Sequence, residues 1–288
     1  MIYHAPVLLQ TVLDFLSPNP GQLYIDATLG GGGHTFEILK RGAKVLGIDR
    51  DPEALEYVKE KISNGDNLTL VQGNFSNIED IATAHGFGQV SGILFDLGVS
   101  SHQLDEASRG FSFKRDGPLD MRMDPSLTVR AKDIINNFPE RRLDEIFKTY
   151  GQEKLSRPIA ASIILARQIE EIRSTSQLAE VIRRVYAKRH VREKIDPATR
   201  AFQALRIVVN SELLNLEEAL PQTSRLLRFG GRLVVISFHS LEDTTVKRFL
   251  KLEKDFEVLT SKPIGPEEEE IRQNPRARSA KLRAAQKV

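Results

Sequence analysis

The stretch that decides the fold is YIDATLGGGGHTFEIL, Tyr24 to Leu39, in which a short apolar run meets four consecutive glycines and a histidine. The apolar run, Leu23 to Gly30, predicts a strand, and the residues after the glycines predict a helix that ends at Gly42. A strand, a glycine-rich turn and a helix N-terminus form a cradle in which the backbone approaches a nucleotide or nucleoside. Many proteins share this turn, so the rest of the chain must indicate which ligand it holds.

Strands and helices alternate regularly after this turn. The pattern predicts strands at 43–51, 68–75 and 90–98, and helices at 52–63 and 76–86. In the first of these helices, Pro52 fits the first turn, and Leu55, Val58 and Ile62 form an apolar stripe. Strands joined by helices of about ten residues predict a parallel sheet with right-handed crossovers. The fold class is therefore α/β, with a Rossmann-like sheet.

The alternation stops in the middle of the chain, where the predicted elements are helices at 141–151, 156–172 and 175–190. Strand character returns at 230–240, after a single helix predicted over 201–227. Two further strands, within 256–260 and 278–288, are expected to form an antiparallel pair, with a polar loop over 262–277. We therefore expect a discontinuous α/β domain, residues 1–103 and 200–288, with an inserted all-helical domain at 104–199.

Composition limits the function. The 288 residues include no cysteine, which excludes a disulfide framework and a zinc-thiolate site. The N-terminus lacks a signal-peptide pattern, and no apolar run approaches the roughly 18 residues of a membrane span, so we expect a soluble, cytoplasmic protein. The net charge is only +2, but residues 183–200 hold seven basic side chains against Glu193 and Asp196, and residues 271–288 hold six with no acid. Such patches can meet phosphates.

Acidic residues narrow the choice of ligand. Asp49 ends the second predicted strand 19 positions after Gly30, where a carboxylate typically accepts from ribose hydroxyls. NAD(P) and S-adenosylmethionine both fit this geometry, whereas a phosphate-binding P-loop would need a following Gly-Lys-Ser/Thr. The turn reads DATLGGGG and not G-x-G-x-x-G, and the fourth strand ends in FDLGVSS, which places Asp96 at the carboxyl edge of the sheet. These features favour S-adenosylmethionine.

Six segments resemble, in order, the signatures of the bacterial 16S rRNA (cytosine-N4)-methyltransferases: VLLQTVL, DATLGGGGH, GIDRDPEAL, FDLGVSSHQLDEASRGFSFKRDGPLDMRMD, ISFHSLED and RSAKLRA. The resemblance implies a class I methyltransferase sheet that binds S-adenosylmethionine. It further implies transfer of the methyl group to the exocyclic N4 amine of a cytidine in the decoding centre of 16S rRNA. The implied partners are 16S rRNA or the small ribosomal subunit and, in addition, a second copy of the chain as a homodimer.

The resemblance also implies site residues. The cofactor contacts fall on Gly32, Gly33, His34, Asp49, Phe75, Asp96 and Gln103. The glycine amides would approach the methionine moiety, Asp49 would accept from the ribose and Phe75 would pack on adenine. Asp96 would meet the α-amino group, and Gln103 would add a hydrogen bond. His34 and Phe75 also have a purely structural interpretation, as a helix-start residue and a core aromatic. No metal is expected.

A third set of residues concerns the methyl transfer itself. The proton acceptor motif of DNA amino-methyltransferases, Asp/Ser/Asn-Pro-Pro-Tyr/Phe, is absent. We expect Asp96, Ser237, His239 and Asp116 as catalytic candidates, because acceptors near the cytosine amine would make its nitrogen more nucleophilic. The block RGFSFKRDGPLDMRMD is expected to bind the RNA through Phe111, Phe113, Lys114, Arg115, Asp120 and Arg122, since RNA bases are commonly splayed out and stacked. The alternative is an ordered loop in which Arg pairs with Asp and Phe packs on the helices.

Two other functions remain compatible with the sequence. An NAD(P)-dependent oxidoreductase could use the same fold, but the helical insert does not suggest a hydride-transfer site. A non-catalytic ribosome-assembly factor that binds RNA could retain the fold with a vestigial pocket. The complete glycine loop, together with Asp49 and Asp96, argues against the second alternative.

Overall fold

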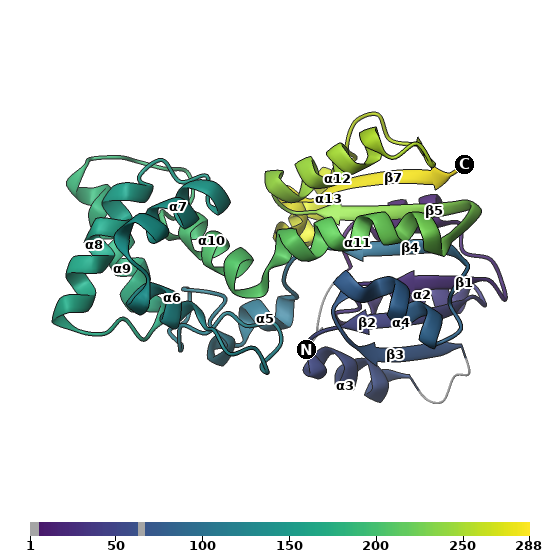
Figure 1. Ribbon diagram of the computed structural model, residues 1–288, viewed down its shortest axis with the longest axis horizontal. Helices are drawn as coiled ribbons and strands as arrows, with labels where there is room; N and C mark the ends of the chain where they lie inside the picture. Colours follow the sequence, from purple (N-terminus) through teal and green to yellow (C-terminus); the bar gives the residue numbers. More distant parts are fainter. Residues whose placement is uncertain (1–5, 63–66) are drawn as a thin grey trace. The chain divides into compact units, whose positions relative to one another are not determined.

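The computed structural model describes residues 6–62 and 67–288 (Figure 1). The chain forms two compact units: an α/β unit, Met1–Ser100 with Leu213–Val288, and a helical unit, Ser101–Glu212. The helical unit extends beyond the expected 104–199, mainly at its C-terminal end. The reason is that α10 (Ala198–Asn210) packs against α6 (Ala131–Asn137), α7 (Glu140–Tyr150) and α9 (Thr175–Lys188).

The α/β unit is built on a seven-stranded sheet with the order β3-β2-β1-β4-β5-β7-β6. Its strands are β1 (Leu23–Asp26), β2 (Lys44–Asp49), β3 (Leu68–Gln72), β4 (Val90–Asp96), β5 (Leu227–Ser237), β6 (Phe256–Val258) and β7 (Lys281–Lys287). The pairings from β3 to β5 are parallel, whereas β7 is antiparallel to both β5 and β6. The expected parallel sheet and terminal antiparallel pair are therefore confirmed.

Helices cover both faces of this sheet, because side chains of a strand alternate between its two sides. On one face, β4 places Ile93 and Phe95 in a core cluster completed by α4 (Ile78–Ala84), α11 (Glu212–Leu226) and α12 (Ser240–Leu252). On the other face, Leu94 joins a cluster with α1 (Leu9–Leu16) and α2 (Gly33–Lys40). The remaining crossover helix, α3 (Pro52–Lys61), packs on β2 and β3, and its N-cap is Asp51, which accepts from the Glu53 N–H. The sheet is thus buried on both sides, as a parallel sheet requires.

The helical unit contains α5 (Ser101–Asp105), α6, α7, α8 (Ser156–Ile169), α9 and α10. Apolar side chains at helical spacing build its core: in α7 these are Leu143, Ile146 and Phe147, and in α9 they include Leu178 and Ile182. A capping box starts α9, where Ser174 accepts from the Gln177 N–H and the Gln177 side chain accepts from the Ser174 N–H. The expected all-helical insert is confirmed in its secondary structure.

Two expectations about secondary structure are wrong. The single helix expected at 201–227 is two helices, α10 and α11, because Ser211 adopts a left-handed conformation with φ 52° that no continuous helix allows. The expected polar loop at 262–277 contains α13 (Glu268–Gln273) and a 3₁₀ turn, Pro275–Ser279. The carboxylate of Glu270 in α13 accepts from the Leu8 N–H at 2.7 Å, so this segment holds the start of α1.

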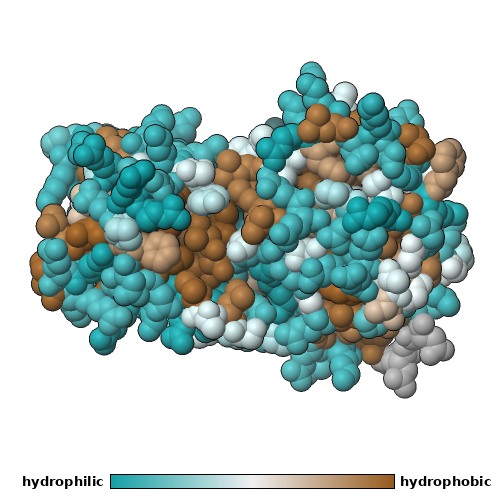
Figure 2. All heavy atoms as spheres, viewed as in Figure 1, coloured by the Kyte–Doolittle hydropathy of each residue, from teal (hydrophilic) through white to brown (hydrophobic). Residues whose placement is uncertain are grey.

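Hydrophilic side chains cover much of the face shown in Figure 2, with smaller hydrophobic areas between them. Within residues 6–62 and 67–288, none of the helices combines the length and the apolar character that crossing a membrane requires. Helices such as α7 and α9 instead have one apolar face that packs in a core and one polar face.

Candidate functional site

Polar side chains stand at the ends of four strands of the α/β unit. Asp26 ends β1, Asp49 ends β2, Asp96 ends β4 and Ser237 ends β5. These strands are parallel neighbours, with Asp49 next to Gln72 of β3 and Asp96 next to Ile236 of β5. Their ends therefore line one edge of the sheet, the edge at which ligands of open α/β folds bind. We name Asp26, Asp49, Asp96 and Ser237 the strand-end set.

Asp49 is fixed by the glycine turn. Its Oδ2 accepts from the Gly30 N–H at 2.8 Å, and its Oδ1 accepts from the Asp51 N–H at 2.9 Å. Burial raises the pKa of this carboxyl from 3.8 to about 6, although both hydrogen bonds favour the charged form. The carboxylate is thus oriented before any ligand arrives, and each oxygen keeps a lone pair that can accept from a hydroxyl.

Asp26 and two threonines that the sequence reasoning did not assign complete the turn. The Asp26 side chain is buried; its Oδ2 accepts from the Thr35 hydroxyl at 2.7 Å, and its Oδ1 accepts from the Thr28 N–H at 3.3 Å. Burial raises the pKa of Asp26. The Thr28 hydroxyl in turn accepts from the Asp96 N–H at 2.6 Å, which ties the end of β4 to the turn after β1. The D-A-T triplet is the sequence pattern that indicates the bond between Asp26 and Thr28, because an Asp side chain often accepts from the backbone N–H two residues further along the chain.

His34 links the turn to two other segments. It is 4% exposed, its Nε2 donates to the carbonyl of Val7 at 3.0 Å, and its Nδ1 lies 3.6 Å from Oδ2 of Asp96. The contact with Asp96 is an ion pair when the imidazole is protonated. His34 therefore positions Asp96, and its expected contact with a cofactor stays a prediction.

The bare backbone at Gly32 and Gly33 has an internal explanation. Gly32 has φ +74°, and a Cβ on it would lie 2.9 Å from the Val58 side chain. A Cβ on Gly33 would lie 3.0 Å from Pro6. Both glycines are therefore required by packing within the α/β unit, whatever ligand their amides meet.

Phe75 and Ser237 differ in how accessible they are. Phe75 follows β3 and is half-buried, with its ring edge-to-face against Phe95 at a centroid distance of 5.6 Å, so part of the ring is open to a ligand. Ser237 is fully buried between β4 and β7, and within the described residues its hydroxyl has no hydrogen-bond partner. A group that is fully buried does not reach a large RNA substrate in this conformation, so the expected catalytic role of Ser237 lacks geometric support.

His239 is a helix cap. Its Nδ1 accepts from the Glu242 N–H at 3.3 Å, and Oε2 of Glu242 accepts from the N–H groups of His239 and Phe238. Together they form the capping box that starts α12. The Nε2 atom of His239 lies 3.1 Å from Oε1 of Glu242, so both ring nitrogens of His239 lie near Glu242. The geometry thus gives His239 a structural role, and its expected catalytic role stays a prediction.

Asp116 also caps a helix, in the helical unit. Its Oδ1 accepts from the Ser176 N–H at 3.0 Å in the first turn of α9. Hydrogen bonds from Ser176 and Ser174 lower the pKa of Asp116. The carboxylate is exposed and already oriented toward α9. A catalytic role for Asp116 would have to be compatible with this cap.

The expected stacking and pairing residues of the RGFSFKRDGPLDMRMD block are largely internal. Phe111 is 7% exposed, and the Phe113 ring lies against Phe202 at 4.8 Å and beneath the Arg183 guanidinium. Asp120 holds Arg122 through two hydrogen bonds, of 2.7 and 2.8 Å. The structure thus corrects the expectation that these two rings and this ion pair are open to RNA; the ordered-loop alternative describes them better.

Lys114 and Arg115 remain at the surface of this block. Both are exposed, and Arg115 donates to the Asp105 carbonyl at 3.2 Å. Gln103, an expected cofactor contact, is buried on α5 of the helical unit. The roles of these three residues stay predictions.

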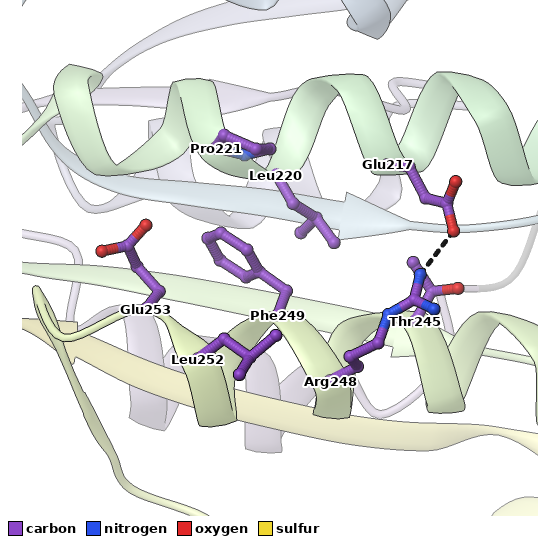
Figure 3. Close-up of a pocket in the computed structure, with 8 residues that line it drawn as sticks. All are labelled: Glu217, Leu220, Pro221, Thr245, Arg248, Phe249, Leu252 and Glu253. Carbon is purple, nitrogen blue, oxygen red and sulfur yellow. Dashed lines mark hydrogen bonds and ion pairs between the residues drawn. The ribbon is translucent and has the colours of Figure 1, made fainter.

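A groove between α11 and α12 is separate from the strand-end set (Figure 3). It encloses about 410 Å³ and is lined by Leu220, Pro221, Phe249 and Leu252, with Arg248 donating to Glu217 across one end at 2.6 Å. The charged groups at that end satisfy each other, and the site carries no convergent set of polar groups for catalysis.

The charge of the strand-end set distinguishes between the two cofactors that the sequence left open. Three carboxylates stand at one edge, and the charges of Asp26 and Asp96 act on each other, as do those of Asp26 and Asp49. Such an edge attracts a sulfonium and an α-ammonium group and repels the pyrophosphate of NAD(P). The dinucleotide order 3-2-1-4-5-6 is also interrupted by the antiparallel β7. Fold and site together define a class I, S-adenosylmethionine-dependent methyltransferase.

The chain belongs to the MraW methylase family, whose model matches residues 1–288. Three similar relatives carry the name ribosomal RNA small subunit methyltransferase H. The protein of Carboxydothermus hydrogenoformans is 47% identical over 99% of this chain and 98% of its own length. The relative in Deinococcus deserti is 49% identical (100% and 94%), and that in Persephonella marina is 46% identical (100% of both). The predicted family and methyltransferase class are confirmed.

Proposed function

We propose that this chain transfers the methyl group of S-adenosylmethionine to the exocyclic N4 amine of a cytidine in the decoding centre of 16S rRNA. The observation that carries the proposal is the acidic strand-end set on a methyltransferase sheet, in a chain that belongs to the MraW methylase family. The names of the relatives support rRNA of the small subunit as the substrate. An NAD(P)-dependent oxidoreductase is disfavoured by the charge of the same edge.

The residues of the α/β unit would divide the cofactor between them. Asp49, held by Gly30 and Asp51, would accept from the ribose hydroxyls, and the open part of Phe75 would pack on adenine. Asp96, held by Thr28 and faced by His34, would meet the α-ammonium group. S-adenosylmethionine would supply an activated methyl group on its sulfonium, so the protein has to align the nitrogen and exclude water.

Alignment of the amine with the methyl group would provide much of the rate acceleration. It would lower the activation barrier by on the order of 7 kcal/mol when the reacting groups are well oriented. The cytosine amine is weakly nucleophilic because its lone pair is delocalised into the ring, and an acceptor near its N–H groups would counter this. Of the four catalytic candidates, Asp96 keeps that role best. Asp116 and His239 cap helices, and Ser237 is fully buried.

The helical unit would recognise the RNA. Its exposed Lys114 and Arg115 are suited to phosphates, whereas Phe111, Phe113 and the Asp120–Arg122 pair would shape the loop that presents them. A homodimer and a cytoplasmic location stay predictions of the sequence.

Nucleoside analysis of 16S rRNA tests the proposal. The rRNA is isolated from cells with and without this chain, and we expect N4-methylated cytidine to disappear in its absence and to return when the gene is restored. An Asp96→Ala variant that binds rRNA but does not restore the nucleoside would support catalysis over an assembly role. Unchanged nucleosides in the deletion would contradict the proposal.

A further inference from the structure

A short basic segment begins at the last residue of α9 in the helical unit. Residues 188–194, Lys-Arg-His-Val-Arg-Glu-Lys, contain four cationic side chains and one acid, and all seven residues are exposed. We name residues 188–194 the basic loop.

The acids within and beside the basic loop are engaged by cations from outside it. Glu193 pairs with Arg200 at 3.3 Å, and Asp196 accepts from Arg183 at 2.8 and 3.1 Å. Each of these pairs joins the loop region to a helix, since Arg183 lies on α9 and Arg200 on α10. The negative charge nearest the loop is therefore neutralised by the scaffold.

The four loop cations themselves lack acidic partners. Within the described part of the chain, no ion pair involves Lys188, Arg189, Arg192 or Lys194. Four other exposed arginines of the same unit do have acidic partners: Arg141 and Arg142 pair with Glu145, Arg173 with Glu171, and Arg184 with Glu180. The basic loop therefore differs from the rest of this unit's surface in having four cations without an ion pair within seven residues. Among the described residues of the unit, the other exposed cations without an ion pair are spread along the chain: Lys114, Arg115, Lys148, Lys154 and Arg157.

The first part of the basic loop has a defined backbone. The N–H groups of Arg189 and Val191 donate to the Tyr186 carbonyl, the His190 N–H donates to Ala187, and His190 is left-handed with φ +53°. A cation in the last turn of a helix is stabilised by the helix dipole, which accounts for Lys188 and Arg189. The dipole acts only within that turn, so it does not account for Arg192 and Lys194.

We propose that the basic loop binds the phosphate backbone of the RNA substrate, with His190 and the arginine guanidinium groups placed to stack on unpaired bases. This inference rests on the proposed function, because it names the surface through which the methyltransferase holds its RNA. Four cations without ion pairs within seven residues would contribute affinity and register but would take no part in methyl transfer.

The test is a fourfold variant, Lys188→Ser, Arg189→Ser, Arg192→Ser and Lys194→Ser, in the full chain. The probe is small ribosomal subunits purified from cells that lack this chain. We expect at least about a tenfold rise in KM for the subunits, with kcat and S-adenosylmethionine affinity unchanged. The slope of log affinity against log salt should become shallower by about 2.8, at 0.7 for each of four contacts with single-stranded RNA.

The matched control removes the same charge from the paired positions, through Arg141→Ser, Arg142→Ser, Arg173→Ser and Arg184→Ser. We expect this variant to keep most of the RNA affinity and the salt slope. An equal loss in both variants would overturn the inference, because net charge alone would then explain it; so would an unchanged slope in the loop variant. If the wild-type chain binds the subunits without methylating them, the proposed function fails, while the two salt slopes still decide the role of the loop.

Discussion

The strand-end set of the α/β unit and the RGFSFKRDGPLDMRMD block of the helical unit differ in what their polar side chains hold. At the sheet edge, Asp49 and Asp26 accept from backbone N–H groups of the turn after β1, and the Asp49 oxygens keep lone pairs that a ligand hydroxyl can use. In the block, Asp120 holds Arg122, and Arg109 donates to the carbonyls of Arg122 and Met123. A long sequence motif such as this block can therefore be required because it folds on itself.

The glycines of the two regions differ in what an added Cβ atom would meet. In the conspicuous GGGG turn, a Cβ on Gly32 would meet the end of a Val58 side chain at 2.9 Å. In the block, a Cβ on Gly117 would lie 1.9 Å from the Ala107 carbonyl oxygen, and one on Gly110 would lie 2.2 Å from that of Pro118. Backbone cannot move aside as a side chain can, so the glycines of the block are the less replaceable ones.

The largest effect is therefore expected for Gly117→Ala. The clash with the Ala107 carbonyl forces a backbone shift and should lower the free energy of unfolding of the helical unit by about 3 kcal/mol or more. Urea unfolding followed by circular dichroism measures it. Gly30→Ala is the control: it has φ +50° but no close neighbour, and should cost only about 1–2 kcal/mol. Equal losses in the two variants would remove the distinction between the regions.

The next effect concerns the strand-end set. Asp49→Ala removes a carboxylate that would accept from the ribose, and we expect S-adenosylmethionine to bind about 10- to 100-fold more weakly, as for a hydrogen bond to a charged group. Calorimetry measures the affinity, and the unfolding midpoint checks that the sheet is intact. Undiminished affinity would place the cofactor elsewhere.

The pH dependence of cofactor binding refines that result. Because the pKa of Asp49 is about 6, its charged fraction falls from about nine-tenths at pH 7 to about one-tenth at pH 5, and the affinity should fall about tenfold. The stability of the ligand-free protein changes with pH in the opposite direction. Because the pKa of Asp49 is higher in the folded state than in the unfolded state, protonation of this group increases the free energy of unfolding as the pH drops from 6 toward 4. Calorimetry across pH 5–7 should show a flat profile for Asp49→Asn; a retained slope would exclude Asp49 as its source.

The smallest effect is expected for Asp116→Ala, which removes a cap of α9 and should cost about 1 kcal/mol in unfolding free energy. Cofactor affinity should not change, because Asp116 lies in the helical unit and not in the strand-end set. Asp116→Asn keeps an oxygen that can accept from the Ser176 N–H. If the Asn variant recovers stability and methylation together, Asp116 acts as a cap; recovery of stability alone would restore its candidacy as a catalytic acceptor.

The α/β order could be predicted because it depends on local patterns. The strand ending at Asp49 and the helix after Pro52 follow from an apolar run and a favoured first-turn residue, and both are present. The break at Ser211 could not be predicted, since a single left-handed residue leaves the apolar periodicity of 201–227 almost unchanged. The helix at 268–273 was likewise hidden in a polar run, and it is held to α1 by a contact between Glu270 and Leu8, far apart in the sequence.

The sequence by itself determined the sheet, its acidic edge and the family, because periodicity, strand ends and motif order are read along the chain. Only the tertiary structure decided which polar residues serve the fold. His239 and Asp116 are residue types that often act in catalysis, yet each caps a helix. Thr28 and Thr35 belong to no catalytic motif, yet both hold the Asp26 carboxylate, and the Thr28 hydroxyl also accepts from the backbone N–H of Asp96. A side chain with spare hydrogen-bonding capacity bonds the nearest unsatisfied backbone group, and which group lies nearest is set by packing.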